Sequence, residues 1–174
     1  MKPFISILAL LFFVNFCFAQ DEAKETKLPS VDVKEVSGAG FNTADIAKEG
    51  KVVVISFWAT WCKPCIQELI AISENYTDWQ EETGVVLYAV SIDDTKSSAK
   101  VAPFVNGKGW EYKILLDENQ DFKRAMNVVN VPHTFVLNKD GNVVWQHTSY
   151  APGDEETLYE VIKKVAAGEQ IEAH

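Results

Sequence analysis

Two strongly apolar runs with a helical stretch between them constrain the fold of this chain most. The runs KVVVISFW (Lys51–Trp58) and GVVLYAVSID (Gly84–Asp93) are rich in β-branched residues, as strands buried on both faces are. Between them, the apolar residues of Pro64–Thr83 recur at helical spacing. A strand, a helix and a second strand in this order predict a parallel pair joined by a crossover helix.

The segments on either side of this unit complete an α/β pattern. Before it, Val31–Val36 alternates apolar and polar residues, as an edge strand does. The other expected elements are a helical turn at 43–51, a helix over about 97–107, a strand at 112–117, a short helix at 119–128, a hairpin over 134–147 and a closing helix with Asp154 as candidate N-cap. The pattern predicts a central mixed β-sheet flanked by helices, with an N-terminal strand or hairpin extension and an extra α-β insertion.

The first 19 residues have the features of a secretory signal peptide. Lys2 precedes an unbroken apolar run, Phe4–Val14, and Ala19 is a small residue at the position where cleavage would fall. The apolar stretch up to Ala19 is about 16 residues long, whereas a helix that spans a bilayer needs ~20. An uncleaved membrane anchor is the alternative, and the large residues before Cys17 disfavour lipid modification of that cysteine.

We therefore expect three segments in a protein that is exported to the periplasm. Residues 1–19 are the signal peptide, residues 20–30 are a flexible N-terminal segment, and residues 31–174 form one domain. If the first segment is not cleaved, it tethers the domain to the membrane. We expect the domain to be a monomer.

The charge of the chain argues against a nucleic-acid partner. The formal net charge is −9, and it becomes −10 once Lys2 leaves with the signal peptide. The phosphates of a nucleic acid would repel so acidic a protein, and no cluster of Lys and Arg is present to bind anionic lipid. The acidity therefore predicts solubility rather than a binding activity.

Two cysteines remain after the signal peptide, and three roles can be weighed for them. Cys62 and Cys65 are too few for a zinc site, which needs three or four protein ligands. The sequence holds no further cysteine pair, and its only histidines are His133, His147 and His174. As a structural disulfide the pair would stabilise little, because it closes a very short loop. We expect no bound metal; a metallochaperone or metal-binding module that uses the two thiols is the alternative.

The position of the pair favours the third role, redox chemistry. Cys62 follows a buried strand and would stand at a helix N-terminus, where free N–H groups and the helix dipole stabilise a thiolate. Cys65 lies one turn further on, and Pro64 suits the first turn because its missing N–H costs nothing there. Cys62 is therefore the expected nucleophile and Cys65 the expected resolving thiol.

At this point the sequence resembles a known family. VVISFWATWCKPC is similar to the active-site strand of the thioredoxin superfamily, and it resembles the exported TlpA/ResA-type thiol–disulfide oxidoreductases more closely. The resemblance covers about residues 28–168 and includes VSIDD, YKILLD and VPHTFVLNKDGNVV. It implies a thioredoxin fold with an extra α-β insertion between core strands. It also implies a redox-active Cys62–Cys65 disulfide and no other cofactor.

The resemblance also implies a substrate-binding face around the cysteines. Pro132 matches the proline whose preceding peptide bond is cis and which faces the cysteine pair, and Val131 would offer its backbone to a bound substrate strand. Trp58 and Trp61 match the aromatic frame of the site; we expect Trp58 in the core and Trp61 on the surface, beside Cys62. The expected docking face therefore consists of Trp61, Lys63, Pro64, Val131 and Pro132.

One acidic residue is expected to move protons. Glu68 matches the carboxyl that follows the second cysteine by three positions in this branch, whereas plain thioredoxin has a buried Asp where this chain has Ser56. A partly buried carboxyl has a raised pKa and can pass protons to and from Cys65. We expect His133 to have only a loop role. Asp93 and Asp94 are interpreted as a strand end that leads into a helix cap.

The residues between the cysteines predict the direction of electron flow. Pro64 in the second position resembles reducing members of the fold, and Lys63 adds a positive charge that favours the thiolate modestly. We expect a reductase with a potential below about −180 mV. An exported reductase needs a membrane electron-donor thiol protein, and its substrate would be a disulfide in another exported protein, such as apocytochrome c. Peroxiredoxins share the fold, but they carry their Thr three residues before the Cys, whereas Thr60 is two before Cys62.

Overall fold

The structure, a computed structural model, describes residues 26–171. The expected signal peptide at 1–19, with Cys17 in it, lies outside this range, as does His174 at the other end. Within the described residues, no helix combines the length and the apolar character that a bilayer crossing requires.

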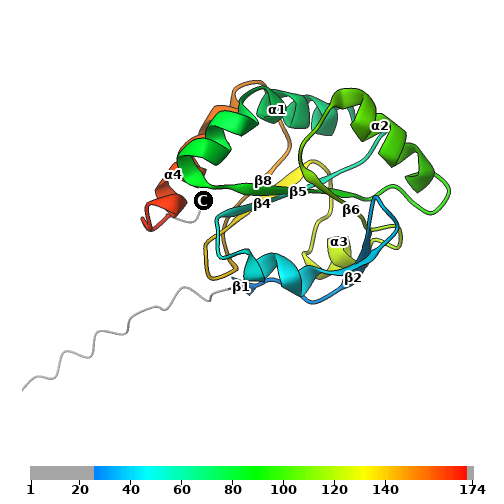
Figure 1. Ribbon diagram of the computed structural model, residues 1–174, viewed down its shortest axis with the longest axis horizontal. Helices are drawn as coiled ribbons and strands as arrows, with labels where there is room; N and C mark the ends of the chain where they lie inside the picture. The colour runs from blue at the N-terminus through cyan, green and yellow to red at the C-terminus, as the bar shows by residue number, and fades with distance from the viewer. Residues whose placement is uncertain (1–25, 172–174) are drawn as a thin grey trace, which may run out of the picture.

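A single eight-stranded mixed sheet runs through the described residues in the order β1-β8-β7-β4-β5-β6-β2-β3 (Figure 1). Its strands are β1 (Thr26–Lys27), β2 (Asp32–Glu35), β3 (Gly40–Asn42), β4 (Val53–Trp58), β5 (Val86–Ser91), β6 (Lys113–Leu116), β7 (His133–Leu137) and β8 (Asn142–Thr148). The helices are η1 (Thr43–Glu49), α1 (Lys63–Thr83), η2 (Ser98–Lys100), α2 (Val101–Lys108), α3 (Asp121–Ala125) and α4 (Asp154–Ala166). The predicted mixed sheet flanked by helices is confirmed.

The centre of the sheet is the strand–helix–strand unit that the sequence predicts. All six residues of β4 and all six of β5 are buried, and the two strands run parallel, with Val53 opposite Val86 and Trp58 opposite Ser91. Strand β7 lies on the other side of β4 and runs antiparallel to it. β-Branched residues with helices above and below them form such doubly buried strands.

Helices cover both faces of this sheet (Figure 1). On one face α4 packs against α1, where the rings of Tyr159 and Trp79 stack with their centroids 4.8 Å apart. Helix α2 covers Trp58 on the same face, with Phe104 centred 5.7 Å from the indole. On the other face, Phe122 of α3 lies 5.1 Å from Phe57 between ring centroids. The hydrophobic core therefore lies on both sides of β4.

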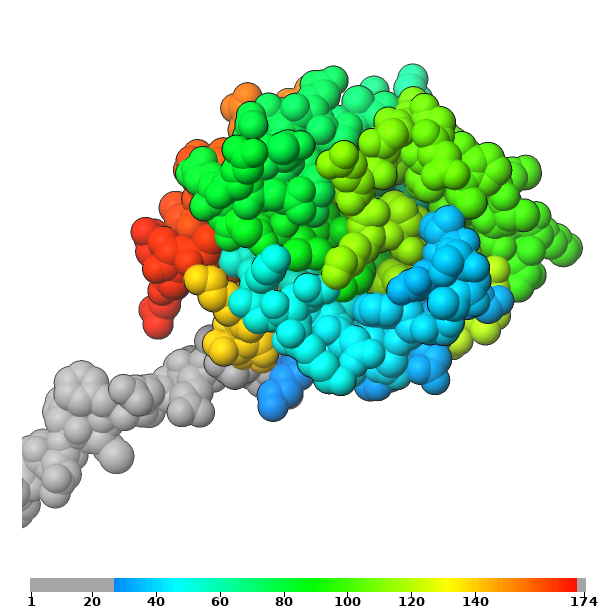
Figure 2. All heavy atoms as spheres, in the orientation of Figure 1, coloured from blue at the N-terminus to red at the C-terminus, as the bar shows by residue number. Residues whose placement is uncertain are grey.

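The N-terminal extension is a hairpin, and the expectation of an edge strand at Val31–Val36 is wrong. Strand β2 lies between β6 and β3, because the chain folds back after Glu35 and pairs Val33 with Phe41. Its outer neighbour β3 therefore occupies the edge of the sheet. Figure 2 shows this hairpin and η1, blue to cyan, packed beside the yellow-green segment that leads into β6. At the opposite edge, Thr26–Lys27 of the segment expected to be flexible pairs with β8.

The start of α4 also differs from the prediction. Gly153, at φ 104°, occupies the N-cap position, and Asp154 is the first helical residue. The Asp154 carboxylate instead accepts a hydrogen bond from the N–H of Ala151 at 2.7 Å, so it closes the turn before the helix. A left-handed N-cap is a position that glycine adopts at little cost.

Candidate active site

Three strand ends meet where the cysteine motif begins. Strands β4 and β5 are parallel, so their carboxyl ends lie together at Trp58 and Ser91. Strand β7 is antiparallel to β4, and its first residue, His133, pairs with Phe57. The chain that leaves β4 towards Cys62 therefore passes beside the chain that enters β7 from Pro132.

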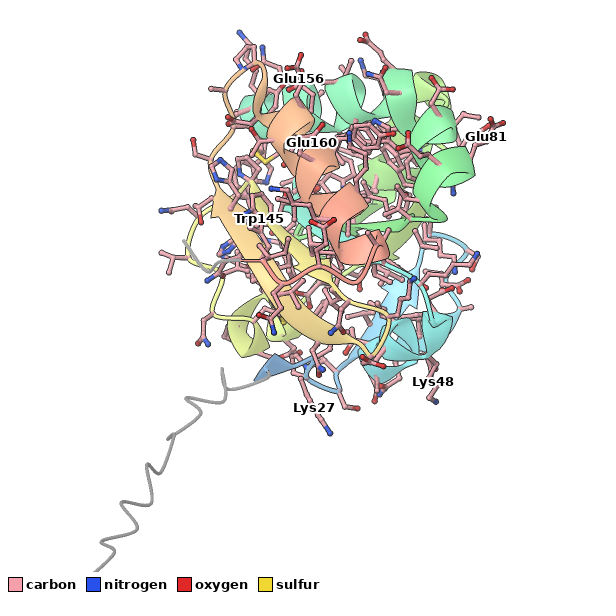
Figure 3. All side chains as sticks on the ribbon, turned by 90° about the vertical axis from the view of Figure 1, so that its left-hand side faces the viewer. Lys27, Lys48, Glu81, Trp145, Glu156 and Glu160 are labelled. Carbon is pink, nitrogen blue, oxygen red and sulfur yellow. A yellow bond between two sulfur atoms is a disulfide. The ribbon has the colours of Figure 1, made fainter. Side chains whose placement is uncertain are left out.

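Cys62 and Cys65 form a disulfide at the N-terminus of α1. Cys62 is the N-cap residue; its N–H donates to the Ala59 carbonyl at 3.0 Å, and its Sγ accepts from the Cys65 N–H at 3.3 Å. Cys65 is fully buried, whereas Cys62 is 4% exposed. Figure 3 shows the disulfide as a yellow bond at the end of the molecule opposite Lys27. The positive end of the helix thus points at the Cys62 sulfur.

Glu68 lies one turn along α1 from Cys65 and is almost fully buried, at 4% exposure. Its Oε1 accepts a hydrogen bond from the Thr134 hydroxyl at 2.7 Å, and its Oε2 accepts one from the Ser56 hydroxyl at 3.2 Å. Ser56 on β4 and Thr134 on β7 are direct partners across the antiparallel ladder, so both hydroxyls point at the helix. The sheet therefore holds both carboxyl oxygens in place.

Burial gives this carboxyl an unusual titration. Loss of solvent raises the pKa of Glu68 from 4.5 to about 7, and the charge of Asp154 adds to the rise. The hydrogen bonds from Thr134 and Ser56 act in the opposite direction, because they stabilise the carboxylate. With its pKa near neutrality, the group can exist as an acid or as a base under ordinary conditions.

The residues of the expected docking face lie on two segments, one at the start of α1 and one that leads into β7. Trp61 is 66% exposed, and Lys63 and Pro64 are exposed at the first turn of α1. The Val131–Pro132 peptide bond is cis, with Val131 half-buried and Pro132 buried. Their contact with a substrate stays a prediction.

Sequence reasoning did not single out one exposed apolar residue. Val129 is 79% exposed, which together with Trp61 makes the two exposed large hydrophobic side chains of the described residues. It lies three residues before Pro132 in the sequence, on the segment that leads into β7. A valine in an otherwise polar loop is a weak signal, because exposed apolar residues are common.

Two further aromatic residues are placed by the structure. Trp58 is fully buried, as expected. His133 is not in a loop, which corrects the prediction: it begins β7, stacks on Phe135 with ring centroids 4.3 Å apart, and has a ring nitrogen 3.2 Å from the Gln146 amide oxygen. Burial lowers the pKa of His133, so the neutral ring is favoured.

Asp93 was predicted only to end a strand, but its side chain also contacts the turn that leads to Cys62. Its side chain is buried and accepts hydrogen bonds from the backbone and the hydroxyl of Thr60, two residues before Cys62. Asp94, by contrast, is exposed and caps the following turn through Ser97, as expected. The spacing from Asp93 to Thr60 is 33 residues, so only the parallel register of β4 and β5 could have revealed the contact.

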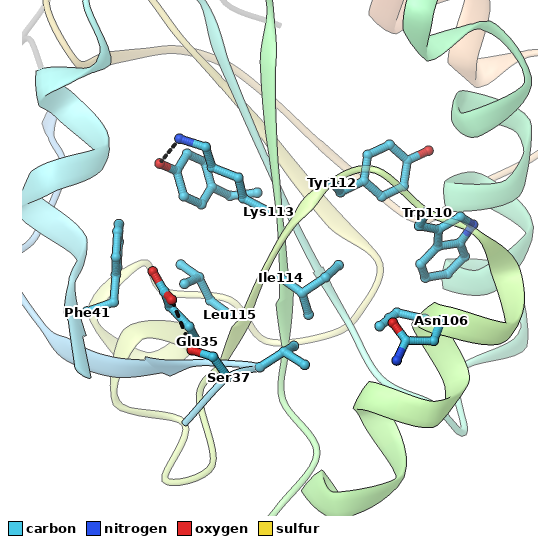
Figure 4. A pocket seen from close by; sticks show the side chains of 12 residues that line it. Glu35, Ser37, Phe41, Asn106, Trp110, Tyr112, Lys113, Ile114 and Leu115 are labelled. Atoms are coloured by element: carbon cyan, nitrogen blue, oxygen red, sulfur yellow. Dashed lines mark hydrogen bonds between the residues drawn. The ribbon is translucent and has the colours of Figure 1, made fainter. Parts of the chain in front are cut away.

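One cavity lies away from these residues. A cavity of about 430 Å³ opens between the β2–β3 hairpin, β6 and α2 (Figure 4), and its lining contains none of the candidate site residues. Two of its lining residues contact each other directly, since the Lys113 ammonium donates a hydrogen bond to the Tyr88 hydroxyl at 3.1 Å. Within residues 26–171, no three His, Cys, Asp or Glu side chains are grouped so as to hold a metal ion.

Comparison with known proteins places the chain among thioredoxin-like proteins. The model of the AhpC/TSA family matches residues 19–146. The chain is a homologue of thiol–disulfide oxidoreductase ResA: it is 34% identical to ResA of Bacillus thuringiensis (strain Al Hakam) over 118 residues. That alignment covers 68% of this chain and 65% of the relative, so it spans just under two thirds of the relative's length.

Solved structures agree with this placement. A thioredoxin-like protein of Porphyromonas gingivalis is 46% identical and superposes with a TM-score of 0.73, over 82% of this chain and 94% of that one. A candidate thiol:disulfide interchange protein DsbE of Chlorobium tepidum is 25% identical, with a TM-score of 0.71 over 82% and 96% of the two chains. The predicted thioredoxin fold and the resemblance to ResA-type proteins are both confirmed.

Proposed function

We propose that this chain, which belongs to the AhpC/TSA family, is a thiol–disulfide oxidoreductase that reduces disulfides in exported proteins. The observation that carries the proposal is the Cys62–Cys65 disulfide at the N-terminus of α1, with the buried Glu68 one turn beyond it. The relatives named thiol–disulfide oxidoreductase ResA support the reaction class.

The first step opens the client's disulfide. In the reduced protein, the Cys62 thiolate attacks one sulfur of the client disulfide, so that a Cys62–client bond forms as the client's own S–S bond breaks. The departing client sulfur leaves as a thiolate and takes up a proton. Cys62 suits the attack because it caps the helix and is the less buried cysteine of the pair.

The second step releases the client. Cys65 gives its proton to the Glu68 carboxylate and attacks the Cys62 sulfur, which re-forms the Cys62–Cys65 bond and expels the second client thiolate. Two electrons have then passed from the protein to the client. A pKa of about 7 lets Glu68 accept a proton in this step and return it when the pair is reduced again.

The client binds on the apolar rim of the site. Trp61 and Val129 supply exposed apolar surface, Lys63 and Pro64 flank the disulfide, and Val131 before the cis-Pro132 bond offers backbone to an extended segment. Exposed aromatic and aliphatic residues of this kind are typical of docking surfaces. The client is an exported protein such as apocytochrome c.

The protein works outside the cytoplasm, in the periplasm, after export through its N-terminal segment. Disulfides persist in such compartments, so a reductase there needs a steady source of electrons. A membrane thiol protein supplies them by reducing the Cys62–Cys65 disulfide. The pair Lys63-Pro64 between the cysteines supports this reducing direction.

A trap experiment in the native organism tests the function. In Cys65→Ser the second step is blocked, so the client should accumulate as a mixed disulfide on Cys62 that a reductant releases. The double variant Cys62→Ser/Cys65→Ser is the matched control and should capture nothing. Recovery of no mixed disulfide, under conditions where the parent turns over, would contradict the assigned roles.

A second variant separates Glu68 from the cysteines. Glu68→Gln keeps the size of the side chain and removes the titrating proton, so the Cys62–client bond should form normally and resolve more slowly, with an altered pH profile. A resolution rate with the parent's pH profile would leave Glu68 without a role in proton transfer.

A further inference from the structure

The turn that presents Cys62 is held from a neighbouring strand by one buried carboxylate. Asp93, two residues past the end of β5, is 1% exposed. Its Oδ2 accepts hydrogen bonds from the Thr60 N–H and the Ser91 hydroxyl, both at 2.8 Å, and its Oδ1 accepts one from the Thr60 hydroxyl at 2.6 Å. A carboxylate so deeply buried is stable only when its oxygens are satisfied in this way.

These contacts begin where the sheet's own hydrogen bonds end. The last bond between the two strands runs from the Ile92 N–H to the Trp58 carbonyl at 2.8 Å. Beyond it, the chain from β4 turns towards α1, and the Asp93 side chain takes the place of the next ladder bond. Two residues later, the Cys62 N–H closes the turn on the Ala59 carbonyl.

We propose that Asp93 is a positioning residue for the Cys62 reaction: by holding both donors of Thr60, it fixes the turn that sets the Cys62 sulfur at the helix N-terminus. The same turn directs Trp61 outward, where it is exposed. The benefit of a helix N-terminus to a thiolate falls off within one turn, so it depends on where the sulfur is held. This inference rests on the proposed function, since it concerns the reactivity of the same thiol.

The adjacent acid provides a matched control. Asp94 is the same residue type one position on, but it is exposed and bonds only to the turn that follows, through Lys96 and Ser97. Asp94→Ala should therefore leave Cys62 unaffected. Thr60→Ser retains both donors to Asp93, whereas Thr60→Val retains the shape of the side chain and removes the hydroxyl donor.

The test measures the rate at which iodoacetamide alkylates Cys62 at a series of pH values. All the chains are full-length and carry Cys65→Ser, so that Cys62 is the one thiol of the pair that can react. We expect Thr60→Val and Asp93→Ala to move the midpoint of the pH–rate profile up by about one unit, which lowers the rate about tenfold at pH values well below both midpoints. Thr60→Ser and Asp94→Ala should match the parent. Asp93→Asn should also stay near it, because the amide can accept from the Thr60 N–H and donate to the Thr60 hydroxyl.

Two outcomes would overturn the proposal. One is an unchanged profile in Thr60→Val and Asp93→Ala, with both variants folded. The other is an equal shift in Asp93→Asn and Asp93→Ala with none in Thr60→Val, since the contacts to Thr60 would then not matter; loss of the Asp93 charge alone would move the profile down, because a nearby negative charge disfavours the thiolate. If Asp93→Ala fails to fold, the comparison of the pH–rate profiles of Thr60→Val and Thr60→Ser tests the proposal by itself. Because alkylation needs no client, a failure of the proposed reductase function leaves this result readable.

Discussion

The burial of Glu68 gives a stability prediction. Its folded pKa of about 7 lies above the 4.5 of an exposed carboxyl, so the folded protein binds the proton more tightly than the unfolded chain. The contribution of Glu68 to the free energy of unfolding should therefore be highest below about pH 4.5, fall as the pH rises to about 7, and stay level above that. The fall should be on the order of 3 kcal/mol. Glu68→Gln should remove this fall.

The measurement is urea unfolding of the oxidised protein at a series of pH values, with and without the substitution. The oxidised form is used because its cysteines do not titrate, and the difference between the two proteins cancels other groups, such as His133. Parallel curves for parent and variant between pH 4.5 and 7 would show that Glu68 is not held in a low-dielectric site.

At this scale the sequence predicted the site in part. Cys62, Cys65 and Glu68 share one helix, so their relation follows from local spacing. The partners of Glu68 do not, because Ser56 and Thr134 are 12 and 66 residues away from it and meet it only through the register of β4 with β7. Asp93 stayed unrecognised for the same reason.

At the scale of the elements, the sequence predicted the position of a strand correctly where the strand is buried on both faces. Strands β4 and β5 are apolar on both faces, and such runs have few other places in a soluble domain. Strand β2 alternates apolar and polar residues. This pattern indicates one buried face but does not determine which strands pair with β2. Whether a second strand covers its outer side depends on a turn at Gly38 with φ 88° and on pairing that no local pattern encodes.

The β7–β8 hairpin gives a prediction at this scale. Its tip residue Gly141 has φ 79°, and a Cβ there would lie 2.5 Å from the Cβ of Ala47 in η1. Gly141→Ala should therefore destabilise the domain both through the backbone, by about 1–2 kcal/mol, and through overpacking, by about 1–3 kcal/mol. The free energy of unfolding by urea measures the sum.

Gly84 supplies the comparison. It has a similar φ of 71° at the end of α1, but a Cβ there would meet no atom within 4 Å. Gly84→Ala should therefore show the backbone cost alone, about 1–2 kcal/mol. Equal losses in the two variants would mean that the hairpin tip can move away from η1 without cost.

At the scale of the whole molecule, the sheet topology explains why the chemistry lies at one end. Strands β4 and β5 deliver their carboxyl ends to the place where β7 begins, so the disulfide, Glu68 and the cis-Pro132 segment converge from separate parts of the chain. The hairpin and the α2–β6 insertion widen the sheet on the far side of β5, away from β7.

The direction of electron flow is a property of the whole protein. The reduction potential of the Cys62–Cys65 pair tests it most directly. Equilibration of the full protein with glutathione or dithiothreitol buffers, followed by the thiol content, gives the value. A reductase with Lys63-Pro64 between its cysteines is predicted to lie below about −180 mV, the value of an isomerase. A potential near about −120 mV, that of a strong oxidant, would contradict the account.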